Sequence, residues 1–283
     1  MSSEPLISHT KSSTSDTENV TPLLCRLFGY PLHASSASNA LQVSLNRHQS
    51  GLNTHVVTLN PEMLMQGDAT PELGEALRSA DVVIPDGAGV VWALNRYQTD
   101  THYTRAPGIE LAEGLLDQCH QHQWPVALIG AAPEVLEQTV SGLQKKFPRL
   151  NIVFHHHGFF DSPEHEADVA QQCIKAQPQL VLVALGVPKQ ELWIRRHYDA
   201  FTKPTLLVGV GGSFDVWSGT KKRAPWLFRA LQCEWLYRIT SEPWRIQRVM
   251  KTLPAFAGRV LRTPAHTALE KAREKVREKP QEI

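Results

Sequence analysis

The chain has 283 residues, of which 42% are hydrophobic and 20% charged, and its formal net charge is +1. This composition excludes wholesale disorder, a collagen-like fibre and a disulfide-built miniprotein, and the length predicts one or two domains. The charge is uneven: residues 219–283 hold 15 Lys and Arg against 6 Asp and Glu, whereas residues 1–218 hold 14 against 22. A basic C-terminal quarter on an acidic body predicts an anionic partner, either a membrane or a nucleic acid.

The first 22 residues are rich in Ser and Thr and are predicted to be disordered, because such a segment buries too little apolar surface to offset its chain entropy. We find no secretory signal pattern near Met1 and no run that approaches the ~18 apolar residues of a transmembrane helix. The four cysteines form no C-x-x-C pair, which favours free thiols in a reducing compartment. We therefore expect a soluble or peripherally attached protein.

Short apolar runs alternate with stretches of helical length between residues 23 and 218. The predicted strands are His55–Leu59, Asp81–Pro85, Pro125–Gly130, Asn151–Phe154, Leu180–Leu185 and Thr205–Val210. The predicted helices include Pro71–Ser79, Ile109–Gln121, Pro133–Phe147, Glu164–Ala176 and Lys189–Phe201. Strands that are apolar throughout indicate a mostly parallel sheet with helices on both faces. Residues 23–218 are therefore predicted to form an α/β domain.

Residues 219–264 are basic and Trp-containing, and they predict a helical appendage interrupted by prolines. These prolines are Pro243, Pro254 and Pro264. Trp together with Lys and Arg suits a membrane interface; nucleic acid would use the same charges, but no nucleic-acid-binding module is recognisable, so we favour lipid. Residues 265–283 are predicted to be a charged tail, in which Leu269 to Lys279 forms a solvated helix or a frayed end.

Glycine or a small polar residue stands at the end of each predicted strand. In an open parallel sheet, ligands bind beyond the carboxyl ends of the strands, where glycine lets backbone approach a ligand and helix starts attract phosphate. The residues at these ends are Thr58 and Asn60, Asp86 to Gly89, Gly130 and Ala131, His155 to Gly158, Gly186 to Glu191, and Gly209 to Asp215. The sequence therefore predicts a binding crevice at this edge of the sheet.

The stretch Gly209–Asp215 is similar to a dinucleotide fingerprint, but Phe214 stands where the third glycine would be needed, and the stretch follows the sixth strand rather than the first. A nicotinamide-dependent oxidoreductase is therefore disfavoured. We favour a seat for a diphosphate around Gly211 and Gly212.

Three residues near the strand ends carry charges that chemistry could use. Asp86 suits a general base and equally a helix N-cap. Arg105 and Arg223 could stabilise a leaving diphosphate, or each could form a surface salt bridge. We expect no metal site, because neighbouring residues of the His155–His157 run point to opposite faces of an extended segment and the chain has no Asp-x-Asp pair.

Seven motifs follow one another along the chain. They are Thr58-x-Asn60, Pro85-Asp86-Gly87-x-Gly89, Arg105-x-x-Gly108, Gly186-x-Pro188-Lys189-Gln190-Glu191-x-Trp193, Gly209-Val210-Gly211-Gly212-x-Phe214-Asp215, Lys222-Arg223-Ala224-Pro225, and Glu234-Trp235-Leu236-Tyr237-Arg238 with Glu242-Pro243-x-Arg245-x-x-Arg248. In this order, from about Cys25 to Arg248, they resemble the signature of the WecG/TagA/CpsF glycosyltransferases (glycosyltransferase family 26). The chain departs from the pattern at Ala131, where many members have Gly, and at Glu110, where Asp is more usual.

The resemblance implies a Rossmann-like fold and a metal-independent, cofactor-free inverting transfer of a hexose. The donor would be a UDP-sugar carrying N-acetylmannosamine, its uronic acid or glucose, and the acceptor a sugar on a polyprenyl diphosphate. Such enzymes build cell-surface polysaccharides at the cytoplasmic face of the plasma membrane, so we expect a peripheral protein there; a homo-oligomer is left open.

The resemblance also implies roles for individual residues. Asp86 would be the base that deprotonates the acceptor, and Gln190 would lie near the reacting centre. The implied binding residues are Thr58 and Asn60 beside the base, Arg105 in the active site, and Arg238, Arg245 and Arg248 in the appendage, facing diphosphate or lipid. The alternative is a non-catalytic nucleotide-binding Rossmann module that docks on membranes; the combination of Asp86 and Gln190 argues against it, because binding alone needs no base.

Overall fold

The computed structural model describes residues 22–97, 102–226, 228, 236–237 and 245–271. The predicted disorder of the N-terminal segment therefore falls almost entirely outside the described residues, as do Pro243 and Arg238. Arg245 and Arg248 lie within the long C-terminal helix.

The core of the fold is a six-stranded sheet, and all its neighbouring strands run parallel. Its strands are β3 (Thr54–Leu59), β4 (Val82–Pro85), β5 (Pro125–Gly130), β6 (Asn151–His156), β7 (Leu180–Ala184) and β8 (Leu206–Gly209), in the order β4-β3-β8-β7-β5-β6. The six predicted strands and the parallel sheet are thus confirmed. In the register of the central pair, Val56 of β3 lies opposite Val208 of β8.

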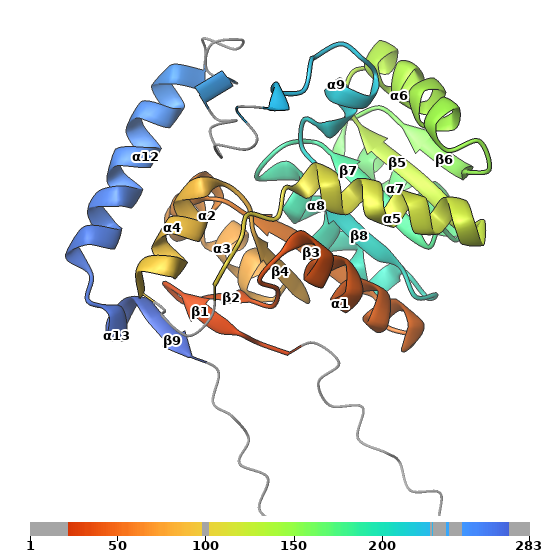
Figure 1. The fold of residues 1–283 in the computed structure, drawn as a ribbon. Coiled ribbons are helices and arrows are strands. Elements are labelled where there is room, and N and C mark those ends of the chain that lie inside the picture. Colours follow the sequence, from red (N-terminus) through yellow and green to blue (C-terminus); the bar gives the residue numbers. More distant parts are fainter. Residues whose placement is uncertain (1–21, 98–101, 227, 229–235, 238–244, 272–283) are drawn as a thin grey trace, which may run out of the picture.

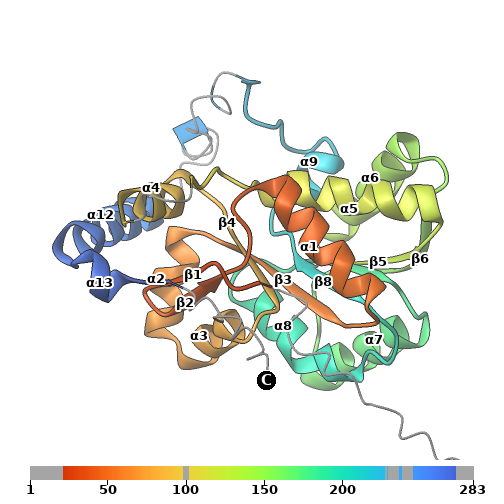
Figure 2. The same ribbon diagram turned by 60° about the horizontal axis from the view of Figure 1, so that its bottom comes forward.

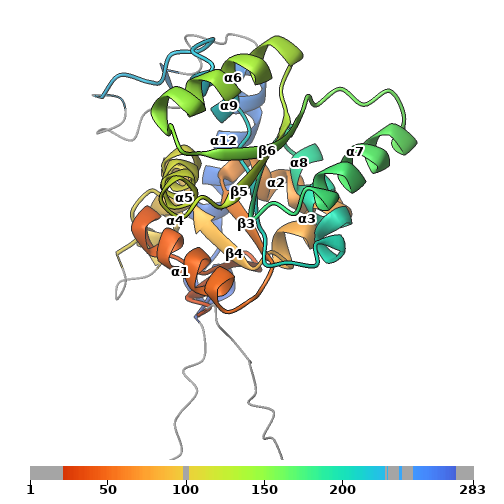
Figure 3. The ribbon, with the colours of Figure 1, turned by 90° about the vertical axis from the view of Figure 1, so that its right-hand side faces the viewer.

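Helices cover both faces of this sheet, as predicted (Figure 1, Figure 3). One face packs against α1 (Ala37–Gln49), α5 (Gly108–His122), α6 (Pro133–Lys146) and α9 (Ser213–Trp217). The other packs against α2 (Pro61–Ala69), α3 (Pro71–Arg78), α4 (Ala88–Tyr97), α7 (Pro163–Lys175) and α8 (Lys189–His197). The predicted helix Lys189–Phe201 ends as an α-helix at His197 and continues as the 3-10 turn η1 (Tyr198–Ala200).

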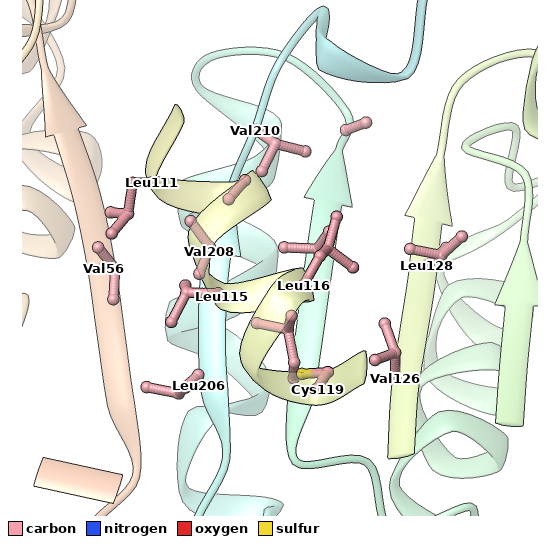
Figure 4. Close-up of a cluster of buried hydrophobic side chains, with 14 of the residues drawn as sticks. Val56, Leu111, Leu115, Leu116, Cys119, Val126, Leu128, Leu206, Val208 and Val210 are labelled. Atoms are coloured by element: carbon pink, nitrogen blue, oxygen red, sulfur yellow. The ribbon is translucent and has the colours of Figure 1, made fainter. Parts of the chain in front are cut away.

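The buried apolar side chains explain why helices pack on both faces of the sheet. Figure 4 shows Leu115, Leu116 and Cys119 of α5 directed toward side chains of the strands, among them Val208 and Leu128. All five side chains are fully or almost fully buried. Because successive strand residues point to opposite faces, a sheet covered on both sides needs apolar residues at every position.

A second, three-stranded antiparallel sheet joins the two ends of the described chain. It consists of β1 (Cys25–Leu27), β2 (Tyr30–Leu32) and β9 (Leu269–Lys271), in the order β2-β1-β9. The prediction of a solvated helix from Leu269 onward is therefore wrong for residues 269–271, since β9 pairs with β1. The boundaries of the predicted appendage and tail stay predictions.

The appendage supplies α12 (Arg245–Arg262), followed by the short α13 (Ala265–Ala268). Figure 2 shows α12 lying beside α4 and α2. The predicted interruption at Pro254 is wrong, because α12 runs through it. A proline inside a helix costs about 3 kcal/mol, and here burial of Phe256 and Val260 in the core offsets that cost.

Candidate active site

The crevice that the sequence predicts would lie where the chain leaves two neighbouring strands in opposite directions. From β3 the chain continues into α2 on one face of the sheet, and from β8 it continues into α9 on the other. Such a switch point leaves the carboxyl ends of the two strands uncovered, and ligands of open α/β sheets bind there. Thr58 and Asn60 stand at the end of β3, and Gly211 and Gly212 follow β8, the strand that pairs with β3.

Asp86 directly follows β4 at the same edge. Its backbone N–H donates to the carbonyl of Leu59 at 2.8 Å, which extends the pairing of β3 and β4 by one residue. Its carboxylate, 24% exposed, accepts a hydrogen bond from Nε of Arg105 at 3.3 Å. The carboxylate is therefore partly exposed at the edge of the sheet and does not lie deep in the core.

The loop that carries Arg105 is fixed on both sides of this residue. The N–H of Thr104 donates to the carbonyl of Ser35 at 2.9 Å, and the N–H of Ala106 donates to the carbonyl of Pro85 at 3.0 Å. The second bond ties the loop to the residue before Asp86. The arginine and the aspartate are consequently held by the same strand end.

Asn95 of α4 anchors the start of this loop. Its side-chain amide donates to the carbonyl of Tyr103, and its side-chain oxygen accepts from the N–H of Tyr103, both at 2.9 Å. The Tyr103 side chain is buried in the core. These contacts fix the point from which the loop crosses the strand ends to α5.

Thr58 and Asn60 are held by contacts of their own. The side-chain oxygen of Asn60 accepts from the N–H of Met63 at 3.0 Å and so caps α2. Thr58 packs against Gly108, the first residue of α5, because a Cβ added to Gly108 would lie 2.9 Å from the Thr58 methyl group. Gly108 thus lets α5 begin directly above the end of β3.

Gln190 approaches the crevice from α8 and is almost completely buried. Its carboxamide oxygen accepts from the N–H of Gly211 at 3.0 Å, and its nitrogen donates to Oε1 of Glu191 at 2.9 Å. Gly209 makes room for both side chains, because a Cβ there would lie 2.5 Å from the Gln190 nitrogen and 2.6 Å from the Glu191 oxygen.

Glu191 is a buried acid to which the sequence analysis gave no role. It is 1% exposed, and its Oε2 has no hydrogen-bond partner among the described residues. Burial raises the pKa of this carboxyl to about 7, because a charged carboxylate loses its hydration there. The sequence pointed to a role for Glu191 only through its place next to Gln190 in the motif Gly186 to Trp193.

Arg223 forms a partly exposed salt bridge with α5, which is the surface salt bridge that the sequence analysis left open for this residue. Its Nη2 donates to Oε1 of Glu110 at 2.5 Å, in the first turn of that helix. Its Nε is buried without a hydrogen-bond partner among the described residues. Glu110, one of the two departures from the family pattern, thus binds the arginine two residues away from Gly108.

The structure therefore brings the candidate residues together in two groups. Thr58, Asn60, Asp86 and Arg105 lie at the ends of β3 and β4, and Gln190 and Glu191 lie against the glycines that follow β8. The adjacency of β3 and β8 joins the two groups. A carboxylate and a guanidinium group at one edge of the sheet can accept a proton and stabilise an anion.

No group of three or more His, Cys, Asp or Glu side chains in the described part of the chain could hold a metal ion. Within the His155–His157 run, His155 lies 3.6 Å from Glu137, whereas His156 stacks on Phe160. These two neighbouring rings thus have different partners.

Comparison with known proteins identifies relatives of the chain. Residues 25–269 match the profile of the glycosyl transferase WecG/TagA/CpsF family. Relatives from Staphylococcus aureus strains MW2 and NCTC 8325 are 37% identical, and one from strain MRSA252 is 36% identical, each over 213 residues that cover 75% of this chain and 82% of the relative. All three are named N-acetylglucosaminyldiphosphoundecaprenol N-acetyl-beta-D-mannosaminyltransferase.

The raised pKa of Glu191 predicts how stability changes with pH. Between pH 4.5 and about 7, the folded protein holds a proton on Glu191 that the unfolded chain releases. The contribution of Glu191 to the free energy of unfolding is thus complete below pH 4.5 and is lost as pH rises through 7, by about 1.4 kcal/mol per unit. Glu191→Gln, which cannot ionise, should gain stability relative to the wild type over this range in urea unfolding.

Burial also lowers the pKa of His33 to about 4, so the unfolded chain takes up a proton between pH 6.5 and 4 that the folded chain excludes. His33 therefore lowers the free energy of unfolding as pH falls, and it does so equally in the wild type and in Glu191→Gln. The difference in unfolding free energy between the two proteins thus reports on Glu191 alone. A difference that stays constant from pH 5 to pH 8 would contradict the assignment.

Proposed function

Since the chain belongs to the WecG/TagA/CpsF family of glycosyl transferases, we propose that it transfers N-acetyl-D-mannosamine from its UDP derivative to N-acetylglucosamine on undecaprenyl diphosphate. The chain is a glycosyltransferase that acts on a polyprenyl-diphosphate-linked sugar. The names of the S. aureus relatives support the choice of sugar and acceptor. The non-catalytic binding module has no support among these transferases.

The observation that carries the mechanism is the pair of Asp86 and Arg105 at the open edge of the sheet. Asp86 accepts the proton of the acceptor hydroxyl while the hydroxyl oxygen forms a bond to the anomeric carbon. The bond from that carbon to the diphosphate breaks, and its electron pair goes to the leaving UDP. A single displacement of this kind inverts the configuration of the donor sugar.

Arginine and the backbone N–H of Gly212 stabilise the leaving diphosphate. We place the diphosphate against Gly211 and Gly212, beside the end of β3. Arg105 belongs to the loop between α4 and α5, which backbone hydrogen bonds fix, and Arg223 is bonded to Glu110. Preorganised donors of this kind contribute about 10²–10³-fold to turnover. Because the chain has no Asp-x-Asp pair, we propose that these groups act without a metal ion.

We propose that α12 attaches the protein peripherally to the cytoplasmic membrane face that carries its lipid-linked acceptor. No helix among the described residues is long and apolar enough to cross a membrane. However, Met250 and Leu261 are 66% and 59% exposed, and because they are eleven residues apart they lie on one side of the helix, roughly a quarter to a third of a turn from the buried Phe256 and Val260. Exposed Lys251 beside this apolar stripe would suit anionic lipid.

Pro254 lies on the same exposed side of α12, where the missing hydrogen bond of a proline faces away from the protein core. The remaining appendage residues, Arg238, Arg245 and Arg248, stay predicted contacts to diphosphate or lipid, and a homo-oligomer stays a prediction.

Asp86→Asn tests the base directly. The variant should lose at least ~10²-fold in kcat, because general base catalysis contributes about 10²–10⁴-fold, while UDP binding and thermal unfolding stay within error of the wild type. Turnover is measured as product mass from UDP-N-acetylmannosamine and a short-chain polyprenyl-diphosphate N-acetylglucosamine. The control is Asp117→Asn on α5, whose partly exposed carboxylate accepts from Gln121, four residues along the same helix. An Asp86→Asn enzyme with wild-type kcat would refute the base assignment.

EDTA tests whether the transfer needs a metal ion. With positive charge supplied by arginine, turnover should stay within about twofold after chelation, measured in the same assay. A complete loss that added divalent metal reverses would overturn the metal-free mechanism.

The membrane contact is tested by point substitution, because α12 buries Phe256 and Val260 and β9 pairs with β1, so removing the appendage would expose the core. Met250→Gln with Leu261→Gln should weaken binding to anionic liposomes roughly tenfold in a sedimentation assay, since two apolar side chains leave the lipid. Val153→Gln on β6 is the control, an exposed apolar residue on the far edge of the sheet. Unchanged binding by the double variant would rule out this face.

A further inference from the structure

The carboxamide of Gln190 is held at both ends, and this fixes which way it points. The N–H of Gly211 can only donate, so the carboxamide oxygen must face it, at 3.0 Å. The carboxamide nitrogen therefore faces Glu191, whose Oε1 accepts one of its two hydrogens at 2.9 Å. The second hydrogen of Gln190 has no acceptor among the described residues.

Glu191 is an unusual residue to find at this position if it served only stability. It is 1% exposed, and its Oε2 has no partner among the described residues. A buried polar atom without a partner lowers stability, and an apolar side chain of similar size usually packs at such a place at no loss. The carboxyl group is thus better explained by what it does to Gln190.

The end of β8 is shaped to admit this pair. Gly209 has no side chain on the face toward α8, and the space that a Cβ would occupy is taken by the Gln190 nitrogen and the Glu191 oxygen. The two side chains therefore lie directly against the backbone that leads into Gly211 and Gly212. The Gln190 carboxamide is bonded directly to the N–H of Gly211 in this turn.

We propose that Glu191 is a positioning residue for the transfer reaction. It holds the Gln190 carboxamide so that its oxygen fixes the glycine turn after β8 and its second N–H can donate to an oxygen atom of the sugar nucleotide. This inference rests on the proposed function, since it needs a donor substrate at this turn. Glu191 itself contacts no substrate.

A double-mutant cycle tests the proposal. Glu191→Met keeps the length of the side chain without an acceptor, and Gln190→Met removes the carboxamide. Each single variant should lower kcat with UDP-N-acetylmannosamine by about tenfold to 10²-fold, as misplaced groups do. The kcat of the double variant should be no more than about twofold below that of the less active single variant, because Gln190 and Glu191 act as one unit. Glu191→Gln, which retains an acceptor oxygen, should recover at least about fivefold over Glu191→Met.

Thr205→Val is the matched control. Thr205 is equally buried, donates to the carbonyl of Pro178 at 2.9 Å, and precedes β8 at the opposite end of the strand. Loss of the Thr205 hydroxyl should change the free energy of unfolding without changing kcat. A fall in kcat that is confined to the Glu191 and Gln190 variants therefore reports on the end of β8 at which the site lies. If Glu191→Met does not fold, Glu191→Ala takes its place in the cycle with the same expectation.

Additive losses in the cycle, or a Glu191→Gln enzyme no better than Glu191→Met, would overturn the positioning role while leaving the transfer reaction intact. Absence of turnover in the unsubstituted enzyme would instead overturn the proposed function, and this inference with it.

Discussion

The departure of the chain from β3 and β8 toward opposite faces of the sheet is the constraint on which the rest of the site depends. Because α2 and α9 leave on different sides, the carboxyl ends of these neighbouring strands stay uncovered. Asp86 enters this opening from β4, Gln190 from α8, and Arg105 from the loop that crosses above it. The apolar layers on both faces hold the strands in register and so hold these side chains in place.

Backbone contacts do most of the positioning in this crevice. The loop of Arg105 is tied through the carbonyl of Pro85, one residue before Asp86, so acid and arginine move together. On the other side, the carboxamide of Gln190 is tied to the N–H of Gly211. The proposed base and the proposed diphosphate seat therefore both lie at the carboxyl ends of the parallel strands, which is the arrangement that we propose for a displacement between two bound substrates.

Much of this could be predicted from the sequence, because strands buried on both faces are apolar throughout and their ends are marked by glycine and polar residues. The pairing of β9 with β1 could not be predicted, because two strands of three residues each, at opposite ends of the described chain, carry no sequence signal that they pair. Pro254 predicted a helix end, but burial of Phe256 and Val260 outweighs the lost hydrogen bond. Glu191 was missed because its burial depends on the packing of α8 against Gly209, which only the structure shows.

A crystal structure of the protein with UDP bound tests the central claim most directly. The account predicts that the diphosphate lies at the ends of β3 and β8, with an oxygen about 3 Å from the N–H of Gly212 and within reach of Arg105, while the N–H of Gly211 stays bonded to Gln190. Diphosphate bound at the far edge of the sheet, beside β5 and β6, would contradict it.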